Sequence, residues 1–105
     1  MGYKLKYTKQ AEKDARLLER DKLAEKAKNL LSIMKRNPYQ NPPPYEKLKG
    51  DLKGSLSRRI NKQHRIIYDV LPNDVGLKDE NGELYKGIIK VIRMWAHYEN
   101  NVNNR

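Results

Sequence analysis

The 105-residue sequence contains no cysteine, which excludes a disulfide framework and thiolate chemistry and agrees with a cytoplasmic protein. It also lacks an apolar run of about 18 residues and the apolar core of a signal peptide, so we expect neither a membrane span nor export. Metal-binding patterns such as HExxH, DxD or paired histidines are missing as well. We therefore expect no metal and no other cofactor.

Positive charge, in contrast, is abundant. The chain has 23 Lys and Arg against 13 Asp and Glu, a net charge of +10. Such an excess attracts polyanions, which leaves nucleic acid, an anionic membrane and an acidic protein as candidate partners. The membrane is the weakest candidate, because no long basic amphipathic helix with Trp or Phe anchors is present. The length fits a single domain with its own core, which we assign to residues 1–98, followed by a polar tail over 99–105.

Apolar periodicity predicts one strand and two helices in the first third of the chain. Alternation over residues 3–7 is typical of a short strand. Thr8 is a suitable N-cap for a helix that ends near residue 18 or 19, and Asp21 is expected to cap a second helix. That second helix ends before Asn37-Pro38. It has the clearest apolar stripe, formed by Leu23, Ala27, Leu30, Leu31 and Met34.

The rest of the chain predicts a long loop and three strands. Residues 37–54 contain four prolines and are expected to form a loop packed onto the body. Strands are expected over 56–60, 64–71 and 88–95, with Asn81-Gly82 as a type I′ turn signal between the last two. This order predicts an α+β fold in which two N-terminal helices pack on a small, mainly antiparallel, four-stranded twisted sheet.

Two arginines are expected side by side on this sheet. With a three-residue turn at residues 61–63, Arg59 lies opposite Arg65, whereas a two-residue turn would pair Arg59 with His64. The first register places an apolar face toward the helices and Ser57, Arg59, Arg65 and Ile67 on the other face. Like charges in opposite positions repel, so either a bound phosphate or acids on neighbouring elements, such as Glu46 or Asp69, must offset them.

Two further residues could take part in chemistry. His97 ends the last predicted strand and Glu46 lies in the loop, although a surface histidine and a solvated loop charge are the plainer interpretations. His64 is better explained as a partly buried structural residue. A carboxylate, an imidazole, two arginines and a lysine together would suit cleavage of RNA through its own 2′-OH, with a base, an acid and cations that stabilise the phosphorane.

The segment NPPPYEKLKGDLKGSLSRRINKQHRIIYDV and the closing His97-Tyr98 resemble the YoeB/Txe toxins of the RelE/ParE superfamily, the toxin halves of bacterial toxin–antitoxin modules. The resemblance covers nearly the whole domain and implies a RelE-like fold. It also implies a ribosome-dependent endonuclease that cuts mRNA in the A site. Its partner would be a YefM-like antitoxin with an acidic segment, and a homodimer is left open.

The same resemblance assigns roles to residues of this chain. Glu46 would be the general base, His97 the general acid, and Arg65 the main phosphate clamp with Arg59 beside it. The expected substrate contacts are Lys49, Arg58, Trp95 and Tyr98.

Two features depart from the family pattern. Trp95 stands where an arginine is usual, two residues before the histidine, and residues 76–87 form a longer, more charged connection. A non-catalytic ribosome-binding toxin, a ParE-like toxin acting on gyrase and a generic nucleic-acid-binding domain are the alternatives.

Overall fold

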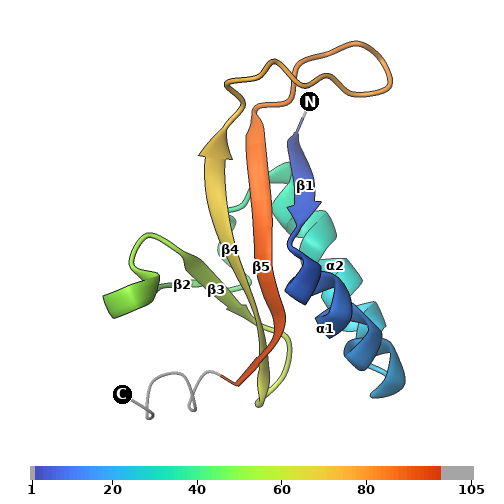
Figure 1. Ribbon diagram of the computed structural model, residues 1–105, viewed down its shortest axis with the longest axis vertical. Coiled ribbons are helices and arrows are strands. Elements are labelled where there is room, and N and C mark those ends of the chain that lie inside the picture. Colours follow the sequence, from blue (N-terminus) through green and yellow to red (C-terminus); the bar gives the residue numbers. More distant parts are fainter. Residues whose placement is uncertain (1, 98–105) are drawn as a thin grey trace.

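The computed structural model describes residues 2–97 and side chains as far as Met94 (Figure 1). The chain forms β1 (Tyr3–Tyr7), α1 (Lys9–Arg20), α2 (Ala24–Arg36), β2 (Glu46–Lys47), the 3-10 turn η1 (Gly50–Leu52), β3 (Leu56–Arg59), β4 (His64–Pro72) and β5 (Gly87–His97). The sheet order is β1-β5-β4-β3-β2, in which β1 runs parallel to β5 and the other neighbours are antiparallel. This confirms the predicted α+β fold and adds β2, a fifth strand that lies inside the predicted loop.

Both helices pack against the sheet and bury one apolar core. In Figure 1 α1 and α2 lie together alongside β1 and β5, whereas β2 and β3 occupy the opposite part of the view. The predicted stripe of α2 is confirmed, since Ala27, Leu31 and Met34 are buried and Leu23 and Leu30 pack against them. The strands contribute Leu56, Ile60, Ile66, Tyr68, Ile89, Val91 and Met94 to the same core. Neither described helix has the length and apolar character needed to cross a bilayer.

The hairpin between β3 and β4 has the register predicted with the three-residue turn. Arg59 lies opposite Arg65, and the backbone N–H of Ile60 donates to the carbonyl of His64 at 2.8 Å. The side chain of Asn61 builds the turn, because its oxygen accepts from the backbone N–H groups of Gln63 at 2.9 Å and His64 at 2.8 Å. The register therefore places Arg59 and Arg65 side by side across the strands.

The prediction that Asp21 caps α2 was wrong. Helix α1 continues to Arg20, and the backbone N–H of Asp21 donates to the carbonyl of Leu17, so Asp21 ends α1 instead. Lys22 then adopts a positive φ of 62°, and α2 begins after Leu23 without a side-chain cap. Only residues 21–23 lie between the two helices, and because Asp21 ends α1 it cannot also cap α2.

The turn near Asn81 also differs from the prediction. A type I′ turn needs positive φ at both central residues, but among the described residues near it only Gly82 has one, at 79°. The carboxylate of Asp79 accepts from the backbone N–H groups of Asn81 at 2.8 Å and Glu83 at 3.0 Å. This contact starts the turn at Asp79 and places Gly82 at its end, where its N–H donates to the Asp79 carbonyl.

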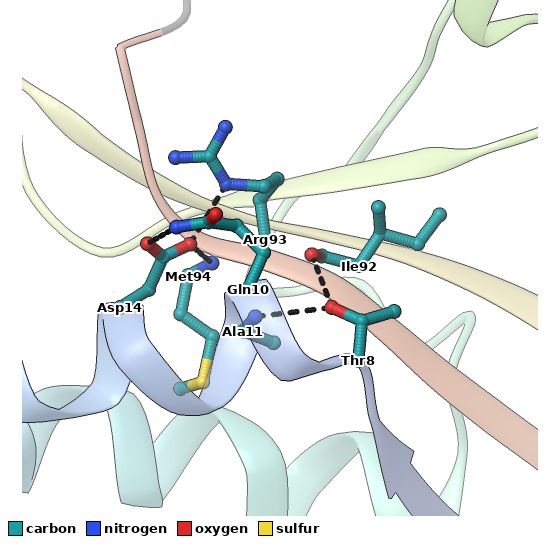
Figure 2. A network of polar contacts seen from close by, with 7 residues as sticks. All are labelled: Thr8, Gln10, Ala11, Asp14, Ile92, Arg93 and Met94. Atoms are coloured by element: carbon teal, nitrogen blue, oxygen red, sulfur yellow. Dashed lines mark hydrogen bonds and ion pairs between the residues drawn. The ribbon is translucent and has the colours of Figure 1, made fainter.

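Thr8 joins the start of α1 to the edge of β5 (Figure 2). Strand β1 pairs with β5 only as far as Val91, and beyond this point the edge of β5 needs other partners. The Thr8 hydroxyl donates to the carbonyl of Ile92 at 2.9 Å and accepts from the backbone N–H of Ala11 at 3.0 Å. One side chain therefore caps the helix, as predicted, and satisfies the open edge of the strand.

Thr8→Val is expected to lower the free energy of unfolding by about 1 to 3 kcal/mol. Loss of an N-cap costs about 1 kcal/mol, and the Ile92 carbonyl loses its donor as well. Urea unfolding followed by circular dichroism measures the effect. Thr8→Ser keeps the hydroxyl and is expected to stay close to the wild type. A Thr8→Val protein as stable as Thr8→Ser would contradict this role of the hydroxyl.

Candidate active site

The centre of the candidate site is an ion pair between β4 and β2. The Arg65 Nη1 lies 2.6 Å from the Glu46 Oε1 and 2.9 Å from the Ser57 hydroxyl. The Arg65 side chain is only 6% exposed, while that of Glu46 is 51% exposed. A carboxylate thus stands at the surface with a guanidinium held beneath it, and the hydrogen bond between them is charge-assisted, which makes it stronger than one between neutral groups. Glu46 is therefore one of the two acids that we considered as partners for the arginines, and it pairs with Arg65.

Strand β2 exists because Glu46 and Lys47 pair with β3. Glu46 lies opposite Ser57, and Lys47 lies opposite Leu56. The ladder is only these two residues long, and the N–H of Leu48 adds one bond to the carbonyl of Ser55 at 2.9 Å. Sequence reasoning missed this strand, because two residues are too few for a periodic pattern. It also missed Ser57 as a site residue, although the alternation already placed Ser57 on the Arg65 face.

Two predicted cations, Arg59 and Lys49, are exposed. Arg59 is exposed and stands opposite Arg65, so the Glu46 carboxylate reduces the repulsion between the two guanidinium groups. Lys49 is exposed just before η1 and lines a hollow of 340 Å³ on this side of the sheet. The walls of this hollow also include Ile67 and Ile92 from the strands and Arg93. The hollow is thus lined by two cations, Lys49 and Arg93, by the acid Asp51 and by apolar side chains of the strands and of η1.

Arg58 does not fit the predicted contact with RNA. Its side chain is fully buried on the core side of β3 and is not exposed at all. The guanidinium donates to the carbonyls of Pro38, Gln40 and Pro43 and to the hydroxyl of Tyr68. These donors are directed into the loop rather than to solvent. We therefore correct the assignment of Arg58 from substrate contact to structural contact.

The end of β5 comes next to Arg65 through backbone pairing. Ala96 lies opposite Arg65, and His97 lies opposite His64. The side chains of Trp95 and His97 and all of Tyr98 lie outside the described part of the chain. His64 itself is buried, which agrees with its predicted structural role. The backbone pairing thus places His97, predicted as the general acid, one register position from Arg65, predicted as the phosphate clamp.

A buried carboxylate on α1 holds this strand in place (Figure 2). Asp14 of α1 accepts from the backbone N–H of Met94 at 2.9 Å and from Nε of Arg93 at 2.8 Å. Gln10 donates to its other oxygen at 3.1 Å. Burial by itself would raise the pKa of Asp14, but the hydrogen bonds from Arg93, Met94 and Gln10 hold the pKa below its ordinary value. Asp14 therefore binds as a carboxylate to the strand that ends at His97.

The described side chains offer no place for a metal ion. No group of three or more His, Asp or Glu residues converges among them in a way that could hold one. The described site contains a half-exposed carboxylate, a buried guanidinium and exposed cations.

Comparisons with known proteins agree with this architecture. A family model described as a YoeB-like toxin of bacterial type II toxin–antitoxin systems matches residues 7–81. Toxin YoeB of Synechocystis sp. is 35% identical over 54 residues, which cover 51% of this chain and 63% of that protein. Toxin YoeB of Streptomyces coelicolor is 38% identical over 47 residues, which cover 45% of this chain and 56% of that protein. The chain thus matches less than two thirds of either relative.

Solved structures extend the likeness to nearly the whole fold. A YoeB/ParE toxin from Agrobacterium tumefaciens has a TM-score of 0.72 at 30% identity, covering 90% of this chain and 99% of the other. The toxin–antitoxin heterotetramer YoeB–YefM from Staphylococcus aureus contains a chain with a TM-score of 0.64 at 29% identity, covering 93% of this chain and 100% of the other.

Proposed function

We propose that this chain, which belongs to the YoeB-like toxins of bacterial type II toxin–antitoxin systems, is an endoribonuclease that cleaves mRNA in the ribosomal A site. The observation that carries the proposal is the contact between Arg65 and Glu46. A buried guanidinium that fixes a half-exposed carboxylate is suited to a reaction at a phosphodiester, since one group stabilises negative charge and the other accepts a proton.

The reaction proposed is attack by the RNA's own 2′-OH. Glu46 takes the proton of the hydroxyl, and the bond between O2′ and phosphorus forms. The bond between phosphorus and O5′ of the next nucleotide breaks, and His97 gives a proton to the departing O5′. The products are a 2′,3′-cyclic phosphate and a 5′-OH, so atoms and charge balance without a metal. Arg65 and Arg59 stabilise the charge of the phosphorane.

The remaining predicted residues take supporting roles in this proposal. Lys49 contacts the RNA backbone from the rim of the hollow that it shares with Ile67 and Arg93, where its charge is exposed. Trp95 stacks on a base, an interaction whose favourable energy depends little on the identity of the base. Tyr98 orients the substrate next to His97. The net charge of +10 favours the approach to the ribosome, whose surface is a polyanion.

A YefM-like antitoxin is the proposed partner. The Staphylococcus aureus relative was solved as a YoeB–YefM complex, and another structure from that organism is described as a YoeB dimer. An acidic segment of such an antitoxin would cover exposed cations such as Arg59 and Lys49 and keep the toxin from RNA.

His97→Ala is expected to remove growth inhibition and to lower mRNA cleavage by about 100-fold or more, the usual contribution of a general acid. Mapping of mRNA 5′ ends in cells that express each protein measures this, and new ends within A-site codons are expected only for the wild type. Binding to the antitoxin is expected to persist. A His97→Ala protein that still arrests growth, with no new 5′ ends in either culture, would favour the non-catalytic ribosome-binding toxin instead.

A further inference from the structure

We propose that Arg58 is a positioning residue for Glu46, which it holds in place through the loop between α2 and β2. This inference rests on the proposed function, because it concerns the placement of the proposed general base. Arg58 itself is too deeply buried to touch RNA. Its effect on cleavage therefore has to pass through the loop that it binds.

The contacts of Arg58 are directed almost entirely to one loop. Its Nη1 donates to the carbonyl of Pro43 at 2.6 Å, and its Nη2 donates to the carbonyls of Pro38 at 2.9 Å and Gln40 at 2.8 Å. The Nε donates to the hydroxyl of Tyr68 at 3.0 Å, and this hydroxyl donates in turn to the Pro38 carbonyl at 2.8 Å. A single side chain thus binds three carbonyls over six residues of the loop.

The composition of the loop explains why it needs such an anchor. Residues 38, 42, 43 and 44 are prolines and have no N–H to donate, so the segment cannot form a backbone ladder of its own. Its inward carbonyls must find donors elsewhere. A planar guanidinium has five N–H donors in a rigid fork and can reach several carbonyls at once, which a lysine ammonium cannot do with the same geometry.

Arg58 is also unusual as a buried charge. Buried arginines are normally paired with a carboxylate, because an uncompensated charge is costly to remove from water. Among the described residues, the hydrogen-bond partners of Arg58 are carbonyl and phenol oxygens, and the ring of Tyr45 lies with its centroid 5.2 Å from the guanidinium carbon. Carbonyl dipoles and an aromatic face stabilise a cation without neutralising it. The loop therefore supplies what a carboxylate would otherwise supply.

The anchored loop leads directly into Glu46. Tyr45, which packs against the guanidinium, is the neighbour of Glu46 in the chain, and β2 has only two residues to fix its own position. On β3, Ser57 lies opposite Glu46 and shares its face of the sheet with Arg65. The next residue, Arg58, lies on the core side and binds the loop that precedes Glu46. The position of the Glu46 carboxylate relative to Arg65 therefore depends on the contacts of Arg58.

The test compares single-turnover cleavage of ribosome-bound mRNA by wild type, Arg58→Lys and Tyr68→Phe. Arg58→Lys keeps the charge and loses the fork, and Tyr68→Phe removes only the hydroxyl that joins Arg58 to Pro38. A misplaced catalytic group costs up to about 100-fold, so we expect a loss of about 10- to 100-fold in the cleavage rate for Arg58→Lys and a smaller loss for Tyr68→Phe. The concentration of ribosomes at half-maximal rate is expected to stay unchanged. Arg16→Lys, on the exposed face of α1, serves as the matched control.

A double-mutant cycle separates positioning from a general loss of structure. In a Glu46→Gln background the base is already missing, so adding Arg58→Lys or Tyr68→Phe is expected to reduce residual cleavage by less than about threefold. If the loss is as large as in the wild-type background, Arg58 does not act through Glu46 and the proposal is overturned. If Arg58→Lys does not fold, the cycle with Tyr68→Phe decides in the same way.

Amide hydrogen exchange tests the anchor without reference to cleavage. Tyr68→Phe and Arg58→Lys are expected to accelerate exchange at residues 39–41 and 45–48, while amides of α1 and β5 stay protected as in Arg16→Lys. Unchanged exchange in this loop would overturn the proposal. If the wild type cleaves no RNA at all, the proposed function fails. Faster exchange in the variants would then show that Arg58 anchors the loop without any effect on catalysis. That result would also overturn the proposal that Arg58 positions a catalytic base.

Discussion

Replacing Arg65 with lysine is expected to lower the rate of RNA cleavage by about 100- to 1,000-fold, the cost of losing one preorganised group that stabilises the transition state. Lysine keeps the charge but not the planar guanidinium, whose Nη1 contacts both Glu46 and Ser57. The buried position of Arg65 makes the loss severe, because water cannot replace the missing donors. Single-turnover cleavage on ribosomes measures the rate.

Arg59→Lys is the matched control for this experiment. Arg59 stands opposite Arg65 on the neighbouring strand but is exposed, so a lysine can still approach a phosphate with water around it. Its loss is expected to be about 10-fold or less, as for other solvent-screened charges. Equal losses in the two variants would contradict the assignment of Arg65 as the main clamp. If Arg65→Lys cleaves like the wild type, the ion pair between Arg65 and Glu46 has only a structural role.

Replacing Asp14 with alanine is expected to lower the free energy of unfolding by about 3 kcal/mol. The change leaves the Met94 N–H without an acceptor inside the protein, and Arg93 loses its charged partner. An unsatisfied buried donor costs about 1 to 3 kcal/mol, and hydrogen bonds to charged groups lie at the upper end. Asp21→Ala removes a surface ion pair with Arg20 at 3.6 Å and is expected to cost less than about 1 kcal/mol.

The effect of Asp14 is expected to depend on pH. Its pKa is lowered in the folded protein, so the unfolded chain binds the proton more readily than the folded one. Its contribution is therefore complete above the unfolded pKa of about 3.9 and is lost as the pH falls toward the lower folded pKa. Urea unfolding of wild type and Asp14→Asn at pH 6 and pH 3 measures the difference. A difference in stability that is as large at pH 3 as at pH 6 would contradict a buried carboxylate at this position.

The sequence alone determined the elements whose signals repeat over several residues. The alternation in residues 3–7 and the stripe in α2 predicted β1 and α2 with their correct inner faces, because burial of one face requires the period of the element. Of the two registers that the sequence left open for the hairpin, the structure has the one with the three-residue turn, which pairs Arg59 with Arg65 and keeps the apolar residues on one face. The family of the chain was recognisable from motifs in the same region.

Only the tertiary structure explains the buried charges, because their partners come from residues distant in the chain. Asp14 occupies a position in the apolar stripe of α1, between Ala11 and Leu18, and only the edge of β5 explains a carboxylate there. Arg58 looked like one of several cations in a basic segment, and only the carbonyls of a proline-containing loop show why it is buried. The periodicity of a segment indicates which of its faces is buried. The partner of a buried charge lies on another element, so it is known only once the elements have packed together.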